Sequence, residues 1–242
     1  MNRLLDSIPW SKIFQAQPGV GVAVISGDGV IEYCNQATCR LFGIPDCVAE
    51  VTGKSLHDIF HPLFADEKLR WIRDVIRSDR PLRGHFVYLG YQLVTSLYSL
   101  GDVEKEGVLA ITVRDGGIDS SEMRAVSSDY IDLGELSPLS QRELEVLVLI
   151  GQGNSVPEVA KLLYRSPRTI ERHKSEIGRK IGISSITEIA SLVARAGLTY
   201  DQTQLTRLKA SPRSQDSKPQ EESPEASKSP EASNDANDGR AS

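Results

Sequence analysis

The sequence has little of the residues and patterns that mark several specialised classes of protein. Its 242 residues include only three cysteines, with no Cys-x-x-Cys spacing and no histidine cluster beside them. A disulfide framework or a structural zinc site is therefore not expected. No apolar run approaches the roughly 18 residues that a membrane-spanning helix needs, and the N-terminus lacks a basic segment followed by an apolar run. We expect a soluble cytoplasmic protein that does not contact a membrane.

The common motifs of enzyme chemistry are also missing. The sequence contains no phosphate-binding glycine loop, no Gly-x-Ser-x-Gly turn and no spaced set of metal ligands. A phosphoacceptor receiver domain would need an acidic cluster after its first strand and a lysine late in a chain of alternating strands and helices, and neither is evident. We expect a protein that is not an enzyme and has no bound metal or cofactor.

Positive charge is not in excess over the whole chain, whose net charge is −5, but it is in excess locally. Residues 137–200 carry nine Lys and Arg against six acidic residues, whereas residues 114–136 carry two against six. The acidic segment also contains Gly116-Gly117, so we expect a linker over 115–136. Ser, Pro, Glu and Ala dominate residues 201–242, which have too little apolar surface to fold and are expected to form a disordered tail.

The residues ahead of the linker combine strand and helix patterns. Apolar residues at helical intervals predict a short flanking helix within residues 1–17. Alternation from Val20, with turn residues at Gly27-Asp28-Gly29, predicts a β-hairpin. Asn35 is a helix cap, and Gly43 suits the left-handed end of that short helix. An amphipathic helix and three strands follow, over 65–78 and near 83–89, 91–100 and 107–113.

This order of elements, with Gly-Asp-Gly-Val-Ile-Glu-Tyr-Cys-Asn-Gln-Ala-Thr-Cys-Arg-Leu-Phe-Gly at 27–43, resembles a PAS domain over residues 18–114. The resemblance implies an α+β domain with a five-stranded antiparallel sheet and helices around a pocket. Such domains sense ligands, light or redox state, or dimerise, so an unidentified small-molecule ligand is a candidate occupant.

Specific cofactors in this domain have weaker support. The candidate haem ligands among the histidines lie outside the 65–78 helix, at His57, His61 and His85. Cysteines are more simply small buried side chains than redox sensors, and here they are Cys34, Cys39 and Cys47. The Asn-Cys-Arg-Phe motif of flavin photoreceptors is missing.

The basic segment 137–200 contains four helix starts. Three are capping boxes, in which a serine is followed three residues later by a glutamate: Ser140 with Glu143, Ser155 with Glu158, and Ser185 with Glu188. The fourth is Ser166 followed by Pro167. The expected helices cover 140–151, 156–164, 167–182 and 185–196, and the tight connection between the second and third is typical of a helix-turn-helix.

The third of these helices has one apolar and one cationic face. Ile170, Ile177 and Ile181 lie together at 100° per residue. The opposite side carries Arg168, Arg172, Ser175 and Arg179. Arginine side chains on an exposed face can attract phosphates and hydrogen-bond guanine in the major groove.

Several motifs at fixed spacing resemble the LuxR-type helix-turn-helix: Leu139-Ser-Gln-Arg-Glu-Leu-Glu-Val-Leu, Glu158-Val-Ala, and Ser166-Pro-Arg-Thr-Ile-Glu-Arg-His with Lys180-Ile-Gly. The resemblance implies that the helix after Ser166 enters the major groove. It implies base-facing positions at Glu171, Arg172 and Ser175, phosphate contacts from Arg168, Thr169, His173, Lys174 and Lys180, and a two-fold dimer contact through residues 186–198. Tyr164 departs from the small residue common before the turn, and Gly178 weakens the helix by about 1 kcal/mol relative to Ala.

Together these features predict a sequence-specific DNA-binding transcription regulator. A homodimer would bind double-stranded DNA through its all-α four-helix domain at 137–200, and the PAS-like domain would sense a signal or mediate dimerisation. RNA polymerase or a signalling protein is a further candidate partner. The alternative from another class is a PAS-based adaptor whose basic helix contacts a protein instead of reading DNA.

Overall fold

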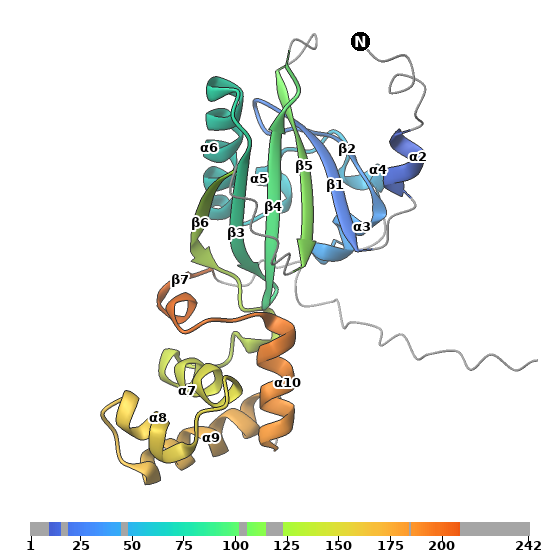
Figure 1. Cartoon of the computed structure of the whole chain (residues 1–242). Coiled ribbons are helices and arrows are strands. Elements are labelled where there is room, and N and C mark those ends of the chain that lie inside the picture. Colours follow the sequence, from blue (N-terminus) through green and yellow to red (C-terminus); the bar gives the residue numbers. More distant parts are fainter. Residues whose placement is uncertain are drawn as a thin grey trace, which may run out of the picture.

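The structure is a computed structural model that describes residues 10–15, 19–44, 48–101, 106–114, 123–183 and 185–208. A sheet with helices forms the N-terminal part, and a cluster of four helices lies beyond one end of the sheet (Figure 1). The α+β domain followed by an all-α domain is the arrangement predicted from the sequence, and it is confirmed.

The N-terminal sheet is built on five antiparallel strands. Their spatial order is β2 (Ile31–Cys34), β1 (Val20–Ser26), β5 (Gly107–Arg114), β4 (Tyr91–Ser99) and β3 (Leu82–Tyr88). The helices of this domain are α2 (Trp10–Gln15), α3 (Gln36–Leu41), α4 (Val48–Val51), α5 (Leu56–Ile59) and α6 (Pro62–Ser78). The predicted hairpin, the capped helix and the later strands are all present.

Asn35 explains how the first helices are attached to this sheet. Its Oδ1 accepts from the backbone N–H of Thr38, which caps α3, and from the N–H of Val22 in β1. Its Nδ2 donates to the carbonyls of Val20 and Phe14, the latter in α2. Because all these groups are satisfied by one buried amide, the residue fixes both the start of α3 and the position of α2.

An aromatic cluster fills the space between the sheet and the helices around α5 and α6. Phe60, Phe64, Phe86 and Tyr88 pack with ring centroids 5.1–5.8 Å apart in the pairs Phe60–Phe64, Phe64–Phe86, Phe60–Tyr88 and Phe64–Tyr88. Phe42 completes the group at 5.3 Å from Phe60. Large aromatic side chains dominate the packing of such a core, so these rings form the centre of the packing between the sheet and the helices around α5 and α6.

Four helices form the second domain: α7 (Gln141–Gly151), α8 (Val156–Leu162), α9 (Pro167–Ile181) and α10 (Ile186–Ala196). All three predicted capping boxes are formed, and Ser166 caps α9 with Pro167 in its first turn. The tight α8–α9 connection is that of a helix-turn-helix. Among the residues that the structure describes, none of the helices has the length and apolar character to cross a membrane.

Two predicted boundaries are wrong. The expected linker over 115–136 contains strand β6 (Arg124–Ile131), which pairs in parallel with β3, and a 3-10 turn, Gly134–Leu136. The expected tail contains a second 3-10 turn, Asp201–Gln204, and strand β7 (Thr206–Arg207), which pairs in parallel with β6. The sheet is therefore mixed and seven-stranded, with β6 between β3 and β7 and β7 at the edge. Composition alone did not reveal these strands, because their hydrogen bonds come from strands distant in the sequence. Other parts of the predicted linker, tail and N-terminal helix lie outside the described residues.

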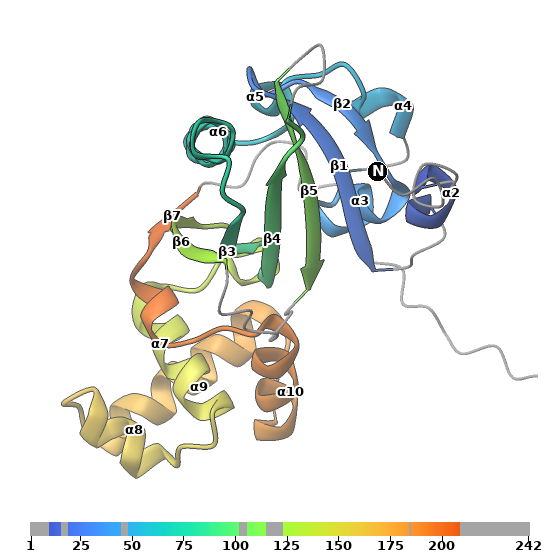
Figure 2. The same ribbon diagram turned by 45° about the horizontal axis from the view of Figure 1, so that its top comes forward.

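The two domains share apolar packing as well as these strands. Val87, Ile131 and Leu133 belong to the same buried cluster as Leu139, Leu147 and the other core residues of the helical domain. The C-terminal end of α10 also reaches the sheet, where Gly197 lies against Gln92 of β4. The chain thus enters the helical domain from β6 and returns through β7 to the edge of the same sheet (Figures 1 and 2).

Candidate nucleic-acid interface

The third helix of the second domain, α9, has a fully buried side and an exposed side. Ile170 and Ile177 have no exposed surface, and they contribute to the core shared with α7 and α8. The helix starts at the Ser166 cap and ends at Gly182, which adopts the left-handed conformation with φ 74°. The apolar stripe predicted from the sequence therefore fixes which side of α9 faces outward.

The outward side carries the residues predicted to face bases. Glu171, Arg172 and Ser175 are all exposed. The Ser175 hydroxyl donates to the Glu171 carbonyl, 3.0 Å away, one turn earlier on the same helix. The turn before α9 and the neighbouring helix α8 lie at the end of the molecule away from the sheet (Figures 1 and 2), so this surface is not covered by the N-terminal domain.

Acidic neighbours neutralise some of the cations on α9 and leave others unpaired. Arg179 binds Glu176 through two nitrogens at 2.8 and 3.1 Å, and Lys174 lies 3.6 Å from Glu171. Arg168 and Arg172 are exposed and form no ion pair with any described residue. Positive charge that is free to bind an anion is thus concentrated in the first half of the helix.

Lys180 forms an ion pair within the domain. The sequence suggested a phosphate contact, but Lys180 Nζ lies 2.6 Å from Glu143 Oε2, and only 25% of its side chain is exposed. Glu143 is the buried glutamate of the α7 capping box, whose carboxylate also accepts from the Ser140 N–H at 2.7 Å. The lysine therefore joins α9 to α7 inside the domain, because a buried carboxylate needs a cationic partner.

Two other predicted phosphate contacts are only partly available. Thr169 is half-buried, and its hydroxyl lies 2.8 Å from that of Ser166 in the cap of α9. His173 is also half-buried. Thr169 thus serves the start of the helix, whereas Arg168 and Arg172 are the fully outward cations.

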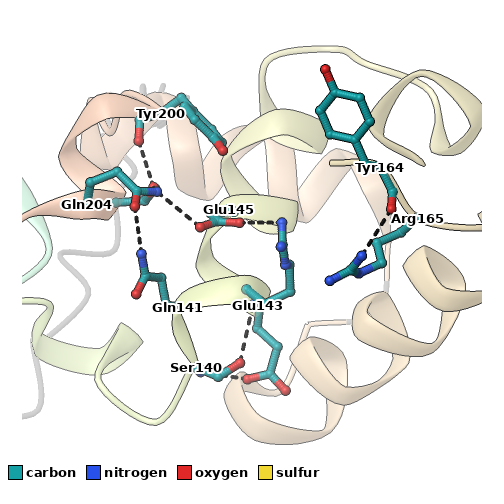
Figure 3. A network of polar contacts seen from close by, with 10 residues as sticks. Ser140, Gln141, Glu143, Glu145, Tyr164, Arg165, Tyr200 and Gln204 are labelled. Atoms are coloured by element: carbon teal, nitrogen blue, oxygen red, sulfur yellow. Dashed lines mark hydrogen bonds and ion pairs between the residues drawn. The ribbon is translucent and has the colours of Figure 1, made fainter. Parts of the chain in front are cut away.

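The helical domain is held in place by a polar network beside α7. Gln204 donates to Glu145 at 3.0 Å, and Glu145 in turn accepts from Arg142 at 2.8 Å (Figure 3). Gln141 donates to the side-chain oxygen of Gln204 at 2.7 Å. This network joins the first turn of α7 to the segment after α10, so α7 is anchored at the same place where the chain returns to the sheet.

Residues of the α8–α9 turn were left out of the predicted site. Tyr164 is 89% exposed with φ 52°, and Leu162 is 53% exposed. Lys161 and Arg165 are also exposed beside them. The one signal for this group in the sequence analysis was the departure of Tyr164 from the small residue that the LuxR-type resemblance implies before the turn.

Lys68 and Glu67 form a largely buried ion pair in the N-terminal domain. Lys68 Nζ lies 2.8 Å from Glu67 Oε2 and 3.5 Å above the Trp71 ring. Glu67 accepts from the Ser128 hydroxyl at 2.6 Å and from the Asp129 N–H at 2.8 Å, both in β6. Burial lowers the pKa of Lys68 to about 7, although the Glu67 carboxylate opposes this shift. The pair therefore joins α6 to the strand that leads into the helical domain.

The described cysteine and histidine side chains of this domain are buried or have partners within the protein. No group of three or more His, Cys, Asp or Glu side chains suited to a metal occurs among the described residues. Cys34 and Cys39 are buried, and burial raises the pKa of Cys34 to about 12, with Cys39 beside it adding to the shift. His57 lies 2.8 Å from Asp66, and His61 caps α6. Cys47 lies outside the described residues.

Comparison with known families assigns both domains. Residues 137–193 match the profile of the bacterial regulatory proteins of the luxR family, and residues 19–96 match that of the PAS domain. These two regions correspond to the helical domain and to the N-terminal sheet with its helices.

Curated relatives share the helical domain. The transcriptional regulatory protein TdiR of Thauera aromatica is 41% identical over 66 residues, 27% of this chain and 28% of that protein. The virulence factors putative positive transcription regulator BvgA of Bordetella pertussis is 35% identical over 78 residues, 32% of this chain and 37% of that protein. This chain thus spans about a third of the length of these relatives.

Among solved structures, a complex of Vibrio cholerae VqmA with ligand and DNA is 17% identical and covers 82% of this chain and 95% of that chain, with a TM-score of 0.46. At this level of similarity nothing about ligand or DNA is carried over. The family profiles and the helical geometry agree: the chain contains a PAS domain followed by a helix-turn-helix domain of the luxR family of bacterial regulatory proteins.

Proposed function

We propose that this protein is a sequence-specific DNA-binding transcription regulator. The observation that carries the proposal is the pair of unneutralised, exposed arginines, Arg168 and Arg172, on the outward side of a helix whose other side is buried in a helix-turn-helix core. An arginine on such a helix can bind guanine O6 and N7 with two hydrogen bonds. The relatives named as transcription regulators share this same domain.

The proposed site assigns different roles to residues on α9. Arg172, Glu171 and Ser175 read base edges, with Glu171 able to accept from the amino group of cytosine. Arg168 and Arg179 approach the phosphates, Lys174 supports Glu171, and Thr169 and His173 position the start of the helix. Lys180 is omitted from the contact set, because its ammonium is committed to Glu143.

The protein is proposed to act in the cytoplasm as a homodimer whose two α9 helices occupy half-sites about one turn of DNA apart. The PAS domain provides the regulatory input through β6, which connects the sheet directly to α7. A change at the Glu67–Lys68 pair would act on this strand, because Glu67 holds Ser128 and Asp129. A ligand of the PAS domain, and a contact with RNA polymerase, are further parts of this proposal.

Selection of bound sequences from a random duplex pool tests the proposal with the full-length chain at a stated salt concentration. We expect enrichment of a two-fold motif. Arg172→Ala should weaken binding to that motif by about 1–3 kcal/mol and blur one base position. The control is Arg73→Ala, which removes the same charge from an exposed position on α6 and should leave affinity unchanged. No enrichment, with equal effects of both substitutions, would favour an adaptor that binds a protein.

A further inference from the structure

The turn between α8 and α9 has an unusual residue at its strained position. The N–H of Tyr164 donates to the Lys161 carbonyl, and the N–H of Arg165 donates to the Ala160 carbonyl at 2.9 Å. These two bonds form the motif that ends many helices, in which the residue at Tyr164 must adopt a left-handed conformation. Its φ is 52°, a conformation that glycine adopts without cost and tyrosine does not. A glycine here would therefore make the folded domain more stable.

Hydrogen bonds of the Tyr164 side chain to the described residues do not offset this conformational cost, because there are none. The side chain is 89% exposed, and its hydroxyl has no hydrogen-bond partner among the described residues. Only its backbone carbonyl takes part in a side-chain contact, accepting from Arg165 at 3.1 Å, while its ring points away from the network beside α7 (Figure 3). Leu162, the last residue of α8, is 53% exposed and places a second apolar side chain two positions before Tyr164.

The charges around the α8–α9 turn indicate what kind of partner binds there. Residues 161–168 contain three cations, Lys161, Arg165 and Arg168, and no acidic residue, and all three cations are exposed. A partner must therefore be anionic and must also accept contact from an aromatic ring. The backbone of duplex DNA meets both conditions, because tyrosine hydroxyls and arginines bind its phosphates while deoxyribose offers apolar surface.

The position of Tyr164 relative to α9 also favours the DNA backbone as its partner. Tyr164 lies two residues before the Ser166 cap, at the same end of α9 as the unpaired Arg168 and Arg172. When the first turns of a recognition helix enter the major groove, the preceding turn lies at the groove wall, where the sugar–phosphate strand runs. The turn is thus continuous with the proposed base-reading surface.

We propose that Tyr164, with Arg165 beside it, is a second DNA contact of this protein that binds the sugar–phosphate backbone flanking the base-reading helix. The inference rests on the proposed function and deepens it. The tyrosine adds affinity that does not depend on base sequence, at the expense of stability in the folded domain. Arg165 contributes charge to the same strand, whereas the neutral tyrosine contributes contact and a hydrogen bond.

Substitution of Tyr164 by glycine separates the effect of the tyrosine on DNA affinity from its effect on the stability of the folded domain. In the full-length chain, Tyr164→Gly should raise the melting temperature by about 2–4 °C and weaken binding to the selected motif and to random duplex alike, by about tenfold. The slope of log affinity against log salt should stay the same, because no charge is lost. Arg165→Ala should instead reduce that slope by about 0.9.

A matched control is Asp79→Gly, since Asp79 is exposed at the end of α6 and has φ 49°. This substitution should also raise stability, without weakening DNA binding. If Arg172→Ala weakens binding while Tyr164→Gly does not, the Tyr164 contact is refuted and the proposed function stands. If the unaltered chain selects no sequence and Arg172→Ala has no effect, the proposed function fails and this inference fails with it.

Discussion

Replacing Lys180 by alanine tests whether this residue supports the fold or contacts DNA. Glu143 Oε2 is 2.6 Å from Lys180 Nζ, and the glutamate side chain is only 8% exposed. Removing one partner of a buried ion pair costs about 3–5 kcal/mol, whereas an exposed pair contributes about 0–1 kcal/mol. Because the lysine keeps 25% of its surface exposed, we expect Lys180→Ala to lower the free energy of unfolding by about 1–3 kcal/mol.

The pH dependence of this loss follows from Glu143. Burial raises the pKa of Glu143, but hydrogen bonds from Lys180 and Ser140 outweigh burial and leave the pKa below its ordinary value of 4.5. A carboxylate with a lowered pKa in the folded state contributes its full stability above its unfolded pKa. The contribution is lost as the pH falls through the folded pKa. The difference between the unaltered chain and Lys180→Ala should therefore be largest at neutral pH and shrink below about pH 4.5.

Urea unfolding followed by helical circular dichroism measures this difference. Both tryptophans, Trp10 and Trp71, precede the helical domain, so their fluorescence would not report on it directly. The control is Arg179→Ala, which removes the same charge from an exposed pair with Glu176 and should not change stability measurably. If Lys180→Ala unfolds like the unaltered chain at pH 7 but reduces the salt slope of DNA binding by about one unit, the lysine contacts phosphate and the structural argument is refuted.

Three further predictions concern other parts of the fold. Gly178→Ala should lower the melting temperature despite better helix propensity, because a Cβ would lie 2.6 Å from the Ile183 carbonyl oxygen; a rise would contradict this packing. Burial lowers the pKa of Lys68 to about 7, so stability should rise from pH 7 towards pH 10, and Lys68→Met should remove that rise in denaturant titrations. Ending the chain after residue 200 removes β7 and the Gln204 contacts and should destabilise the helical domain, whereas ending it after residue 208 should not; equal melting temperatures would show that the returning segment contributes nothing.

Local patterns were sufficient to predict much of the fold. Asn35, Ser140, Ser155 and Ser185 act as helix caps where the sequence predicted them, because a cap depends on residues only a few positions apart. The apolar spacing of α9 likewise predicted its buried side, and the core confirms Ile170 and Ile177 there.

Long-range pairing was not predictable in the same way. Strand β6 is largely polar and β7 has only two residues, and each pairs with a strand distant in the sequence, β3 for β6 and β6 for β7. Composition predicted a linker and a tail for these segments because most residues of β6 are exposed or half-buried and so need not be apolar. The parallel pairing also joins the two domains more closely than the predicted linker implied.

The sequence by itself determined the two kinds of domain, the helix starts and the cationic side of α9, since each depends on local spacing and periodicity. Only the tertiary structure decided which of those cations remain free. Lys180 pairs with the buried Glu143, 37 positions away, whereas Arg168 and Arg172 form no ion pair with a described residue. Whether a charge faces a partner inside the protein or an anion outside depends on where the rest of the chain places its acids, and that placement exists only after folding.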